Sequence, residues 1–272
     1  ENQDLNTAEF NRKPIGTGPF ALDEWVQGQR LSLKANPLYF GTKPKLDKII
    51  WKKVADSNVL GLQLLNGEVD GATVTPELLP QVKGNPNLQV YETVGANTYI
   101  GFQLDNPLFQ DMRVRQALSY GLDRSAILDK ILQGQGVQST SHIMPNSWAY
   151  NPNVEKFEFN QAKARQMLAE AGWKPGADGV LVKDGQMFQF VLLTNTGDKT
   201  REAIALFARQ QWGELGVQVE PQFLEANTFI QERVLKQKFD AILLAGSVNV
   251  DPDYLTRNFH TKAIPPAGNN FL

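Results

Sequence analysis

The sequence predicts an α/β fold, because short strands alternate with helices along most of the chain. Residues 20–25 and 30–34 alternate outward-facing and inward-facing side chains on either side of Gly28, a pattern typical of a hairpin. Residues 199–215 instead repeat apolar side chains at helical spacing. The change from short strands to longer helices, near residues 95–106, marks the best candidate for a domain boundary.

The first part of the chain is expected to contain several short elements. A β-rich stretch at residues 48–54 precedes Asp56 and Ser57, either of which can cap a short helix that Asn66-Gly67 ends. Thr75-Pro76 is expected to start a second helix, because proline at the first helical position loses no needed N–H. Further strands are predicted at residues 69–72, 88–94 and 98–104.

The second part is expected to be more helical. Asp111, Asp123 and Asn160 are predicted helix caps, and residues 134–159 form a long irregular excursion rich in Gly, Pro, Asn and Ser. Strands at 187–193, 217–223 and 239–245 alternate with helices at 199–215 and 226–235. The apolar faces of these elements predict a core of Leu118, Leu168, Phe190, Leu206 and Val219.

Composition excludes several classes of protein. The 272 residues carry 27 basic and 29 acidic side chains, so the chain lacks the concentrated positive charge that nucleic-acid binding needs. The absence of cysteine removes disulfides and thiolate catalysis but leaves the compartment open. No apolar run approaches the roughly 20 residues that cross a bilayer. Residue 1 is Glu and no signal peptide is present, so we expect a chain that is processed or cut from something longer.

Sequence motifs of catalysis and cofactor binding are missing. The chain has no phosphate-binding glycine loop, no HExxH and no GxSxG motif. Residues 16–19 contain two glycines, but the strand that follows favours a simple turn. The two histidines, His142 and His260, are far apart and are expected to be solvated loop residues. We therefore expect no enzyme, no metal and no cofactor.

For three groups of residues, the sequence is consistent with both a binding role and a structural role. Asp240, Asp251 and Asp253 fit a hard-cation site or a carboxylate pair, but residues 251–254 also fit a turn followed by a capped helix. Arg113 and Arg115 fit either anion binding or surface salt bridges. Trp148 and Tyr150 need an apolar partner on their loop, which is either the protein's own core or a ligand or closing lobe.

Several segments, in the right order, together resemble the family 5 extracellular solute-binding proteins of ABC importers, of the dipeptide- and oligopeptide-binding type. They are residues 14–20 (PIGTGPF), 36–40 (NPLYF) with 43–47 (KPKLD), 65–70 (LNGEVD), 109–118 (FQDMRVRQAL) with 122–124 (LDR), 162–173 (AKARQMLAEAGW), 239–240 (FD) with 251–253 (DPD), and 268–271 (GNNF). Each segment is weakly specific, but their common order covers residues 14–271.

The resemblance implies a type II periplasmic-binding-protein architecture with two lobes and the solute between them. Family members are longer, so the chain is expected to be a fragment that lacks the N-terminal part of lobe I and the C-terminal tail. The expected division has the later part of lobe I at 1–97, a hinge crossing at 98–105, a complete lobe II at 106–238, and the return crossing with the start of the C-terminal part of lobe I at 239–272.

The function implied is that of a non-catalytic receptor, which captures a peptide or peptide-like solute and delivers it to the membrane permease of an ABC importer. The resemblance also implies a monomer in the periplasm or outside the cell, with a lipid anchor as one option. The alternatives are a transport-inactive sensor or structural module of the same fold, and a binder of a non-peptide solute such as a nickel chelate, an opine or an oligosaccharide.

The expected ligand-binding residues lie at the two crossings and on the long loop. They are Tyr99, Gly101, Gln103, Gly246, Ser247, Asn249, Asp251 and Trp148. Peptide-binding members hold the peptide's amino group with an Asp, and the gapless alignment puts Asn249 at that position, with Asp251 two residues away. An amide is a poor partner for a buried ammonium, so either Asp251 takes the role or recognition of a free amino terminus is weakened. The Trp common in this segment is replaced by residues 246–248 (GSV).

Overall fold

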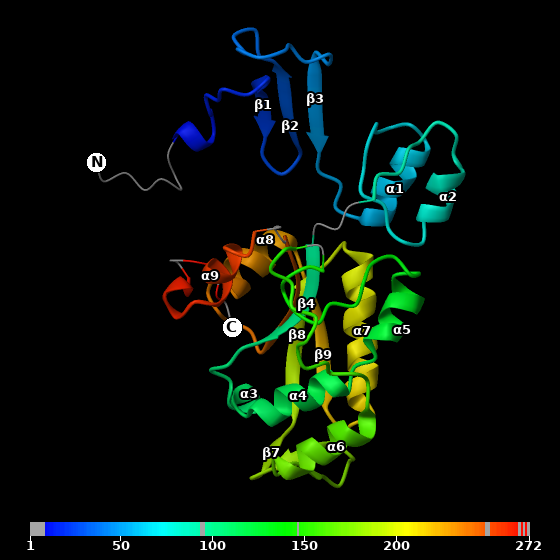
Figure 1. Ribbon diagram of the computed structural model, residues 1–272, viewed down its shortest axis with the longest axis vertical. Coiled ribbons are helices and arrows are strands. Elements are labelled where there is room, and N and C mark those ends of the chain that lie inside the picture. The colour runs from blue at the N-terminus through cyan, green and yellow to red at the C-terminus, as the bar shows by residue number, and fades with distance from the viewer. Residues whose placement is uncertain are drawn as a thin grey trace.

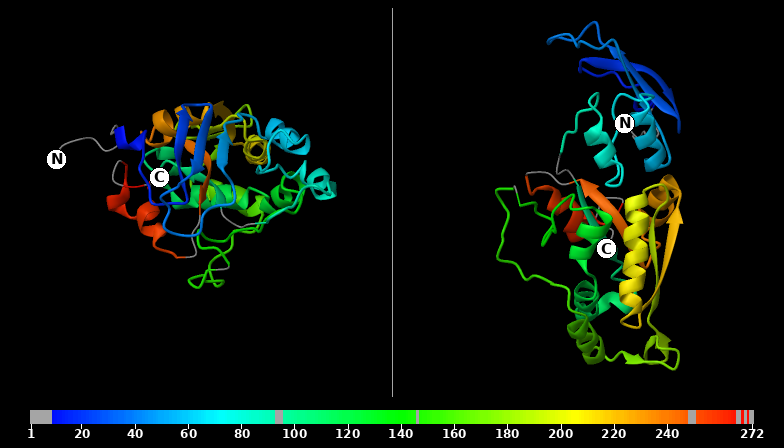
Figure 2. Two further views of the ribbon diagram at one scale, coloured as in Figure 1. Left: turned by 90° about the horizontal axis from the view of Figure 1, so that it is seen from above. Right: turned by 90° about the vertical axis from the view of Figure 1, so that its right-hand side faces the viewer.

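The computed structural model divides the chain into two parts, stacked along the longest axis of the molecule (Figures 1 and 2). We call residues 9–92 the N-terminal part and residues 96–265 the main part. The structure describes residues 9–92, 96–145, 147–247, 251–265, 268 and 270.

An antiparallel sheet of three strands forms the outer end of the N-terminal part (Figure 1). Its strands are β1 (Phe20–Val26), β2 (Arg30–Ala35) and β3 (Lys48–Lys52), in that order. Gly28 turns the chain between the first two with φ of +76°, a conformation that glycine adopts without strain. The predicted hairpin is therefore confirmed. A short 3₁₀ turn, η1 (Glu9–Asn11), precedes the sheet.

Two helices, α1 (Ser57–Leu65) and α2 (Leu79–Gly84), complete the N-terminal part. Of the two predicted caps of α1, Asp56 takes the role, and the helix ends before Asn66. The strand predicted at 69–72 is wrong, and so is the described portion of the strand predicted at 88–94, because residues 69–72 and 88–92 are irregular. Both segments carry an apolar pattern, but such a pattern does not show whether a neighbouring strand is present to pair with it.

A mixed sheet of four strands forms the centre of the main part (Figure 1). Its order is β4 (Ala96–Phe102), β10 (Ala241–Ser247), β8 (Gln189–Asn195) and β9 (Gln218–Leu224). β4 runs antiparallel to β10, whereas β8 is parallel to both β10 and β9. The chain moves outward from β8 to β9 and then returns to β10, so the connections reverse direction between β8 and β10.

Helices cover both faces of this sheet, and a small sheet closes its far end (Figure 1). Asp111, Asp123 and Asn160 cap α4 (Met112–Tyr120), α5 (Arg124–Ala126) and α6 (Gln161–Glu170), as predicted. The remaining elements are α3 (Pro107–Gln110), η2 (Ile127–Ile131), β5 (Lys174–Pro175), β6 (Leu181–Lys183), β7 (Gln186–Met187), α7 (Lys199–Gly213), α8 (Ala226–Thr228), η3 (Phe229–Val234), α9 (Tyr254–Phe259) and η4 (Thr261–Ala263).

The larger hydrophobic core lies between one face of the main sheet and α4, α6 and α7. Leu118, Leu168, Phe190 and Val219 are buried in it, as predicted. Leu206 is a correction, because 49% of its surface is exposed. On the opposite face, Phe229 and Val234 of η3 pack with Leu193 and Ile242 in a second cluster.

Within the part of the chain that the structure describes, no helix combines the length and the apolar character needed to cross a membrane.

Candidate functional site

Four strand ends meet at the edge of the main sheet that faces the N-terminal part (Figure 1). The carboxyl ends of β8, β9 and β10 lie at this edge, together with the amino end of β4. Gly246 and Ser247 pair there with Asn97 and Ala96. Ligands of open α/β sheets bind outside the carboxyl ends of strands where the connections reverse, and this edge contains that reversal between β8 and β10.

An aromatic cluster lies beside the end of the two crossing strands. The ring of Tyr99 meets the imidazole of His142 edge-on at 5.6 Å, and His142 meets Phe259 at 4.6 Å. The hydroxyl of Tyr254 donates a hydrogen bond to the carbonyl oxygen of His142. Residues from β4, the long loop and α9 therefore meet in one place.

Burial keeps the ionisable members of this cluster neutral near pH 7. It raises the pKa of Tyr99 and of Tyr254, and it lowers the pKa of His142, because desolvation penalises the charged form. A neutral phenol and a neutral imidazole can each donate and accept a hydrogen bond. The expectation that His142 is a solvated loop residue is therefore wrong, whereas His260 is exposed and its Nδ1 accepts a bond from the Lys262 N–H.

Gly246 leaves room above Tyr99. A methyl group built at this glycine would lie 3.6 Å from Cε1 of Tyr99, an ordinary contact distance. Gly246 pairs with Asn97 and Leu244 pairs with Tyr99, so Gly246 and Tyr99 belong to the same face of the sheet. A side chain larger than alanine at position 246 would begin to cover the tyrosine ring.

The long loop is tied to the main part at several points. The Arg124 guanidinium donates to the carbonyl oxygens of Ser139 and Phe157, near the two ends of the loop. Tyr254 holds it in the middle through His142. Trp148 has 76% of its surface exposed, whereas Tyr150 is half-buried with its hydroxyl 3.4 Å from that of Thr140. Of the two aromatic side chains, Trp148 is the one left open to a partner.

Two of the expected ligand-binding residues, Gly101 on β4 and Gln103 just after it, lie deeper in the main part. Gly101 is buried and pairs with Ile242 of the second hydrophobic cluster. Gln103, with 6% of its surface exposed, lies just beyond the strand, where its Oε1 accepts a bond from the Asp105 N–H. At about 3.3 Å per residue, Gln103 lies roughly 20 Å from the sheet edge.

The acidic residues of the return crossing have separate structural roles. Asp240 accepts hydrogen bonds from the Asn106 side chain at 2.9 Å and from the Val191 N–H at 3.0 Å. Asp251 is exposed and accepts from the Asp253 N–H at 3.0 Å, in the turn before α9. This confirms the turn-and-helix interpretation of residues 251–254, although Asp253 caps α9 without a side-chain hydrogen bond. Asn249 lies outside the described residues.

Candidate ion-binding groups are absent from the described ranges or are already engaged. No cluster of three or more His, Asp or Glu suited to a metal occurs among the described residues. Arg113 pairs with Asp111 at 2.7 Å, and Arg115 donates to the carbonyl oxygens of Phe109 and Gln110. Neither arginine reaches the sheet edge, which favours the structural interpretation of both.

Two cavities lie elsewhere in the molecule. One of about 390 Å³ borders the first sheet, lined by Phe20, Trp25 and Leu31 among others. The other, of about 620 Å³, lies by the turn before β6 and the start of β9, with Asp178 and Glu220 in its wall. Neither includes a residue of the aromatic cluster, so we assign the candidate site by strand topology and side-chain chemistry rather than by cavity size.

The family model of the bacterial extracellular solute-binding proteins, family 5 (Middle), matches residues 1–265. The chain belongs to this family. Among curated relatives, the oligopeptide-binding protein AppA of Bacillus subtilis is 40% identical over 256 residues, which are 92% of this chain and 47% of the relative. The chain thus spans about half the length of the curated relatives it matches.

Solved structures of the family share the fold. The Bacillus subtilis AppA structure, in complex with a nonapeptide, matches 96% of this chain and 53% of its own with a TM-score of 0.88 and 38% identity. NikZ of Campylobacter jejuni, in complex with Ni(L-His), matches 99% of this chain and 55% of its own with a TM-score of 0.88 and 28% identity. The mixed α/β architecture is therefore that of the type II periplasmic binding proteins, as expected.

Proposed function

We propose that this chain is part of the substrate-binding component of an ABC importer, which captures a peptide or peptide-like solute between two hinged lobes. The observation that carries the proposal is the likeness to the Bacillus subtilis AppA structure, whose solved complex contains a nonapeptide. The antiparallel pair of β4 and β10 supports it, because it gives the two crossings that a hinge between lobes needs.

In this proposal, residues 1–97 belong to lobe I, residues 98–105 and the start of 239–272 are the crossings, and residues 106–238 form lobe II. Solute meets the sheet edge at Tyr99, Gly246 and Ser247, with His142 and the exposed Trp148 supplied by the long loop. Neutral hydrogen-bonding groups and aromatic faces suit a peptide backbone, whose amides are also neutral. Closure then adds contacts from the other lobe, and solute shifts the population toward the closed form.

We also propose an oligomeric state, a location and partners for the protein. It acts as a monomer in the periplasm or outside the cell, with or without a lipid anchor, and passes solute to membrane permease subunits. It is a binder rather than an enzyme, since binding by lobe closure needs no nucleophile or general base. A turnover assay with peptides and esters should therefore give no product.

A nickel chelate is the second candidate solute. NikZ, solved with Ni(L-His), matches this chain with the same TM-score as AppA, and its identity is 28%. His142 is held neutral in the aromatic cluster, and neutral imidazole is the form that ligates metal. This candidate predicts that a metal chelate, rather than a peptide, co-purifies with the full-length protein.

Native mass spectrometry of the full-length protein as isolated distinguishes these candidates. A bound mass that matches peptides supports the first candidate, and a mass that includes nickel supports the second. Protein that stays free of ligand after incubation with peptides and with Ni(L-His) would point to the sensor or structural module instead.

The amino-end position gives a sharper test of peptide recognition. If Asn249 faces the amino group of the peptide, Asn249→Asp in the full-length protein should strengthen binding of free-amino peptides by about tenfold to a hundredfold. N-acetylated peptides should gain much less. If Asp251 already fills the role, the gain should be small, because two nearby carboxylates raise each other's pKa. Equal gains for free and acetylated peptides would place the amino-end site elsewhere.

A further inference from the structure

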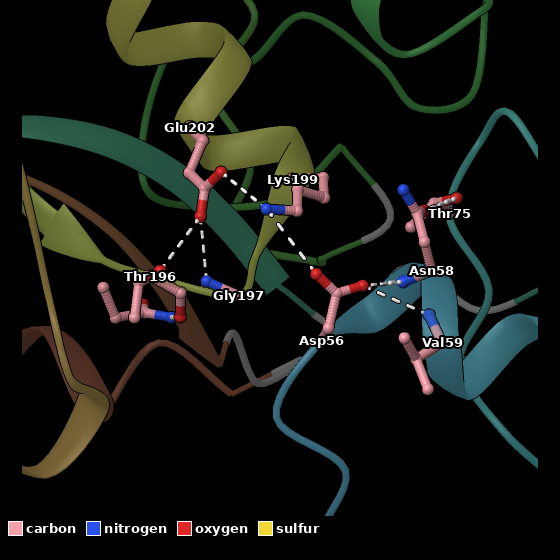
Figure 3. Close-up of polar contacts among 9 residues, drawn as sticks. Asp56, Asn58, Val59, Thr75, Thr196, Gly197, Lys199 and Glu202 are labelled. Carbon is pink, nitrogen blue, oxygen red and sulfur yellow. Dashed lines mark hydrogen bonds and ion pairs between the residues drawn. The ribbon is translucent and has the colours of Figure 1, made fainter.

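The connection from β3 to α1 and the first residue of α1, residues 53–57 together, contact the main part. One contact lies at the amino end of α7 (Figure 3) and the other at the amino end of α8. We call this set of contacts the seam. On the N-terminal side it contains Lys53, Asp56 and Ser57, and on the main side Gly197, Lys199 and Glu225. The three residues on the main side directly follow or flank the carboxyl ends of β8 and β9, at the same edge as the candidate site.

A backbone hydrogen bond brings the two parts close together at Gly197. The Ser57 N–H donates to the Gly197 carbonyl oxygen at 3.1 Å. Gly197 has φ of +89°, and a Cβ at this position would lie 2.1 Å from the carbonyl oxygen of Ala55. Only glycine fits both the conformation and the close approach, so any side chain here must push the two parts apart.

Asp56 serves both its own helix and the seam. Its Oδ1 accepts from the N–H groups of Asn58 and Val59, at 2.9 and 3.1 Å, and thereby caps α1. Its Oδ2 lies 3.5 Å from Nζ of Lys199, which is also 3.1 Å from Glu202 (Figure 3). Lys199 therefore lies between a carboxylate of each part, and its loss would leave the two acidic groups facing each other.

Glu225 combines the same two roles as Asp56, but it belongs to the main part and faces a lysine of the N-terminal part. Its Oε2 accepts from the N–H groups of Asn227 and Thr228, at 2.8 and 3.0 Å, and caps α8 in the main part. Its Oε1 lies 3.8 Å from Nζ of Lys53 in the N-terminal part. Each part thus supplies a helix-capping carboxylate whose second oxygen faces a lysine of the other part, which makes the seam specific to one relative orientation.

We propose that the seam is an interlobe latch, which holds the two parts in one orientation when no solute is bound and which must slide or open when their orientation changes. The link to solute capture rests on the proposed function, because a latch of this kind sets the ratio of orientations that a solute then shifts. The latch itself is a property of the ligand-free chain and can be tested without any solute.

Spin-label distance measurements on the ligand-free chain test the latch. The chain has no cysteine, so labels attach only at Gln81→Cys on α2 and Ala162→Cys on α6, both of which are exposed positions. We expect one main distance for the otherwise unchanged chain. Asp56→Asn and Lys199→Met should each raise the ratio of other distances to the main one by about 1.5- to 5-fold, the range for exposed charge pairs. Asn caps helices as well as Asp, so Asp56→Asn should leave α1 folded.

Gly197→Ala should have the largest effect, because the added methyl group removes the close approach at the seam. High salt should make the distance distribution of the unchanged chain resemble that of Asp56→Asn, because salt screens exposed ion pairs. It should not reduce the effect of Gly197→Ala on that distribution. Circular dichroism checks that each variant is folded. If Gly197→Ala does not fold, Asp56→Asn and Lys199→Met alone test the latch.

Asp23→Asn is the matched control. It removes the same charge, but Asp23 pairs with Lys48 and Lys34 inside the first sheet, at 2.8 and 3.5 Å. This variant should leave the distances unchanged. The latch is overturned if the charge variants and any folded Gly197→Ala variant keep the original distance distribution, or if Asp23→Asn changes it as much as Asp56→Asn. Because no solute is present, a failure to find peptide binding would leave this result intact, and the reverse also holds.

Discussion

Single residues determine where most helices of this chain begin, and these positions can be read from the sequence. Asp56, Asp111, Asp123 and Asn160 each accept a hydrogen bond from an N–H within three residues, so the cap needs no information from the rest of the fold. The environment of His142 is different. Its carbonyl partner, Tyr254, is 112 residues away, and no local pattern could have placed the two together.

Asp111 should make stability depend on pH. Its hydrogen bonds to the Arg113 side chain hold the pKa of this carboxyl below its usual range. A carboxyl with a lowered pKa in the folded state stabilises the fold above its unfolded pKa, and this contribution is lost as the pH falls through its folded pKa. Asp111→Asn keeps the cap but removes the charge.

We therefore expect Asp111→Asn to lower the free energy of unfolding at pH 7 by less than about 1 kcal/mol, because the arginine is half-exposed and water screens the pair. The difference from the original chain should shrink as the pH falls below about 4, the ordinary pKa of an aspartate, and vanish once the pH is well below the lowered pKa of Asp111. Urea unfolding at several pH values measures it. A difference that does not shrink at all as the pH falls below about 4 would contradict the role given to the carboxylate.

At the scale of elements, α7 shows what an apolar pattern can and cannot predict. The extent of the helix was predicted to within two residues, and Ile204 and Leu215 are buried as their spacing indicates, but Leu206 was wrongly assigned to the core. Ala205 and Ala208 are fully buried and let the helix approach the sheet closely, whereas Leu206 faces outward. Hydrophobicity ranks leucine above alanine, so only the packing partner reveals the true rotation of the helix.

Trp212 should be the most sensitive position of α7. Its side chain is 1% exposed, packs against Phe102 and Phe190, and donates from Nε1 to the Leu118 carbonyl oxygen at 2.9 Å. Trp212→Phe leaves a cavity and an unpaired buried carbonyl, so it should cost about 2–4 kcal/mol of unfolding free energy. Leu206→Ala, on the exposed face, should cost less than about 1 kcal/mol. Equal losses in chemical unfolding would contradict the assigned helix face.

The whole molecule is uneven in its stability, because both hydrophobic clusters are built from residues of the main part. The N-terminal part instead exposes large apolar side chains, among them Phe40, Trp25 and Trp51. Regions with few buried apolar contacts open at lower free energy. The division into lobes stays a prediction from element pattern and motif order, whereas the seam contacts and the aromatic cluster could not be predicted, because they join residues from separate elements.

Hydrogen exchange should reveal this unevenness. Amides of β1, β2 and β3 should exchange at least about a hundredfold faster than those of β8 and β10, which corresponds to about 2.7 kcal/mol in opening free energy. Mass spectrometry of peptic fragments measures both sets in one experiment. Similar protection in the two sheets would mean that the N-terminal part is stabilised as strongly as the main part.

We propose that solute meets this chain at the edge where β4 and β10 end. A chain that spans half of its relatives cannot enclose a ligand fully, so we expect weak binding, with a Kd of about 1 mM. Titration of the isotope-labelled chain with a nonapeptide, followed by NMR, detects binding of this strength and locates it. We expect shifts concentrated at Tyr99, His142, Gly246 and Ser247. Shifts confined to the cavity beside β1 and β2, or no shifts at several millimolar of both peptide and nickel chelate, would contradict it.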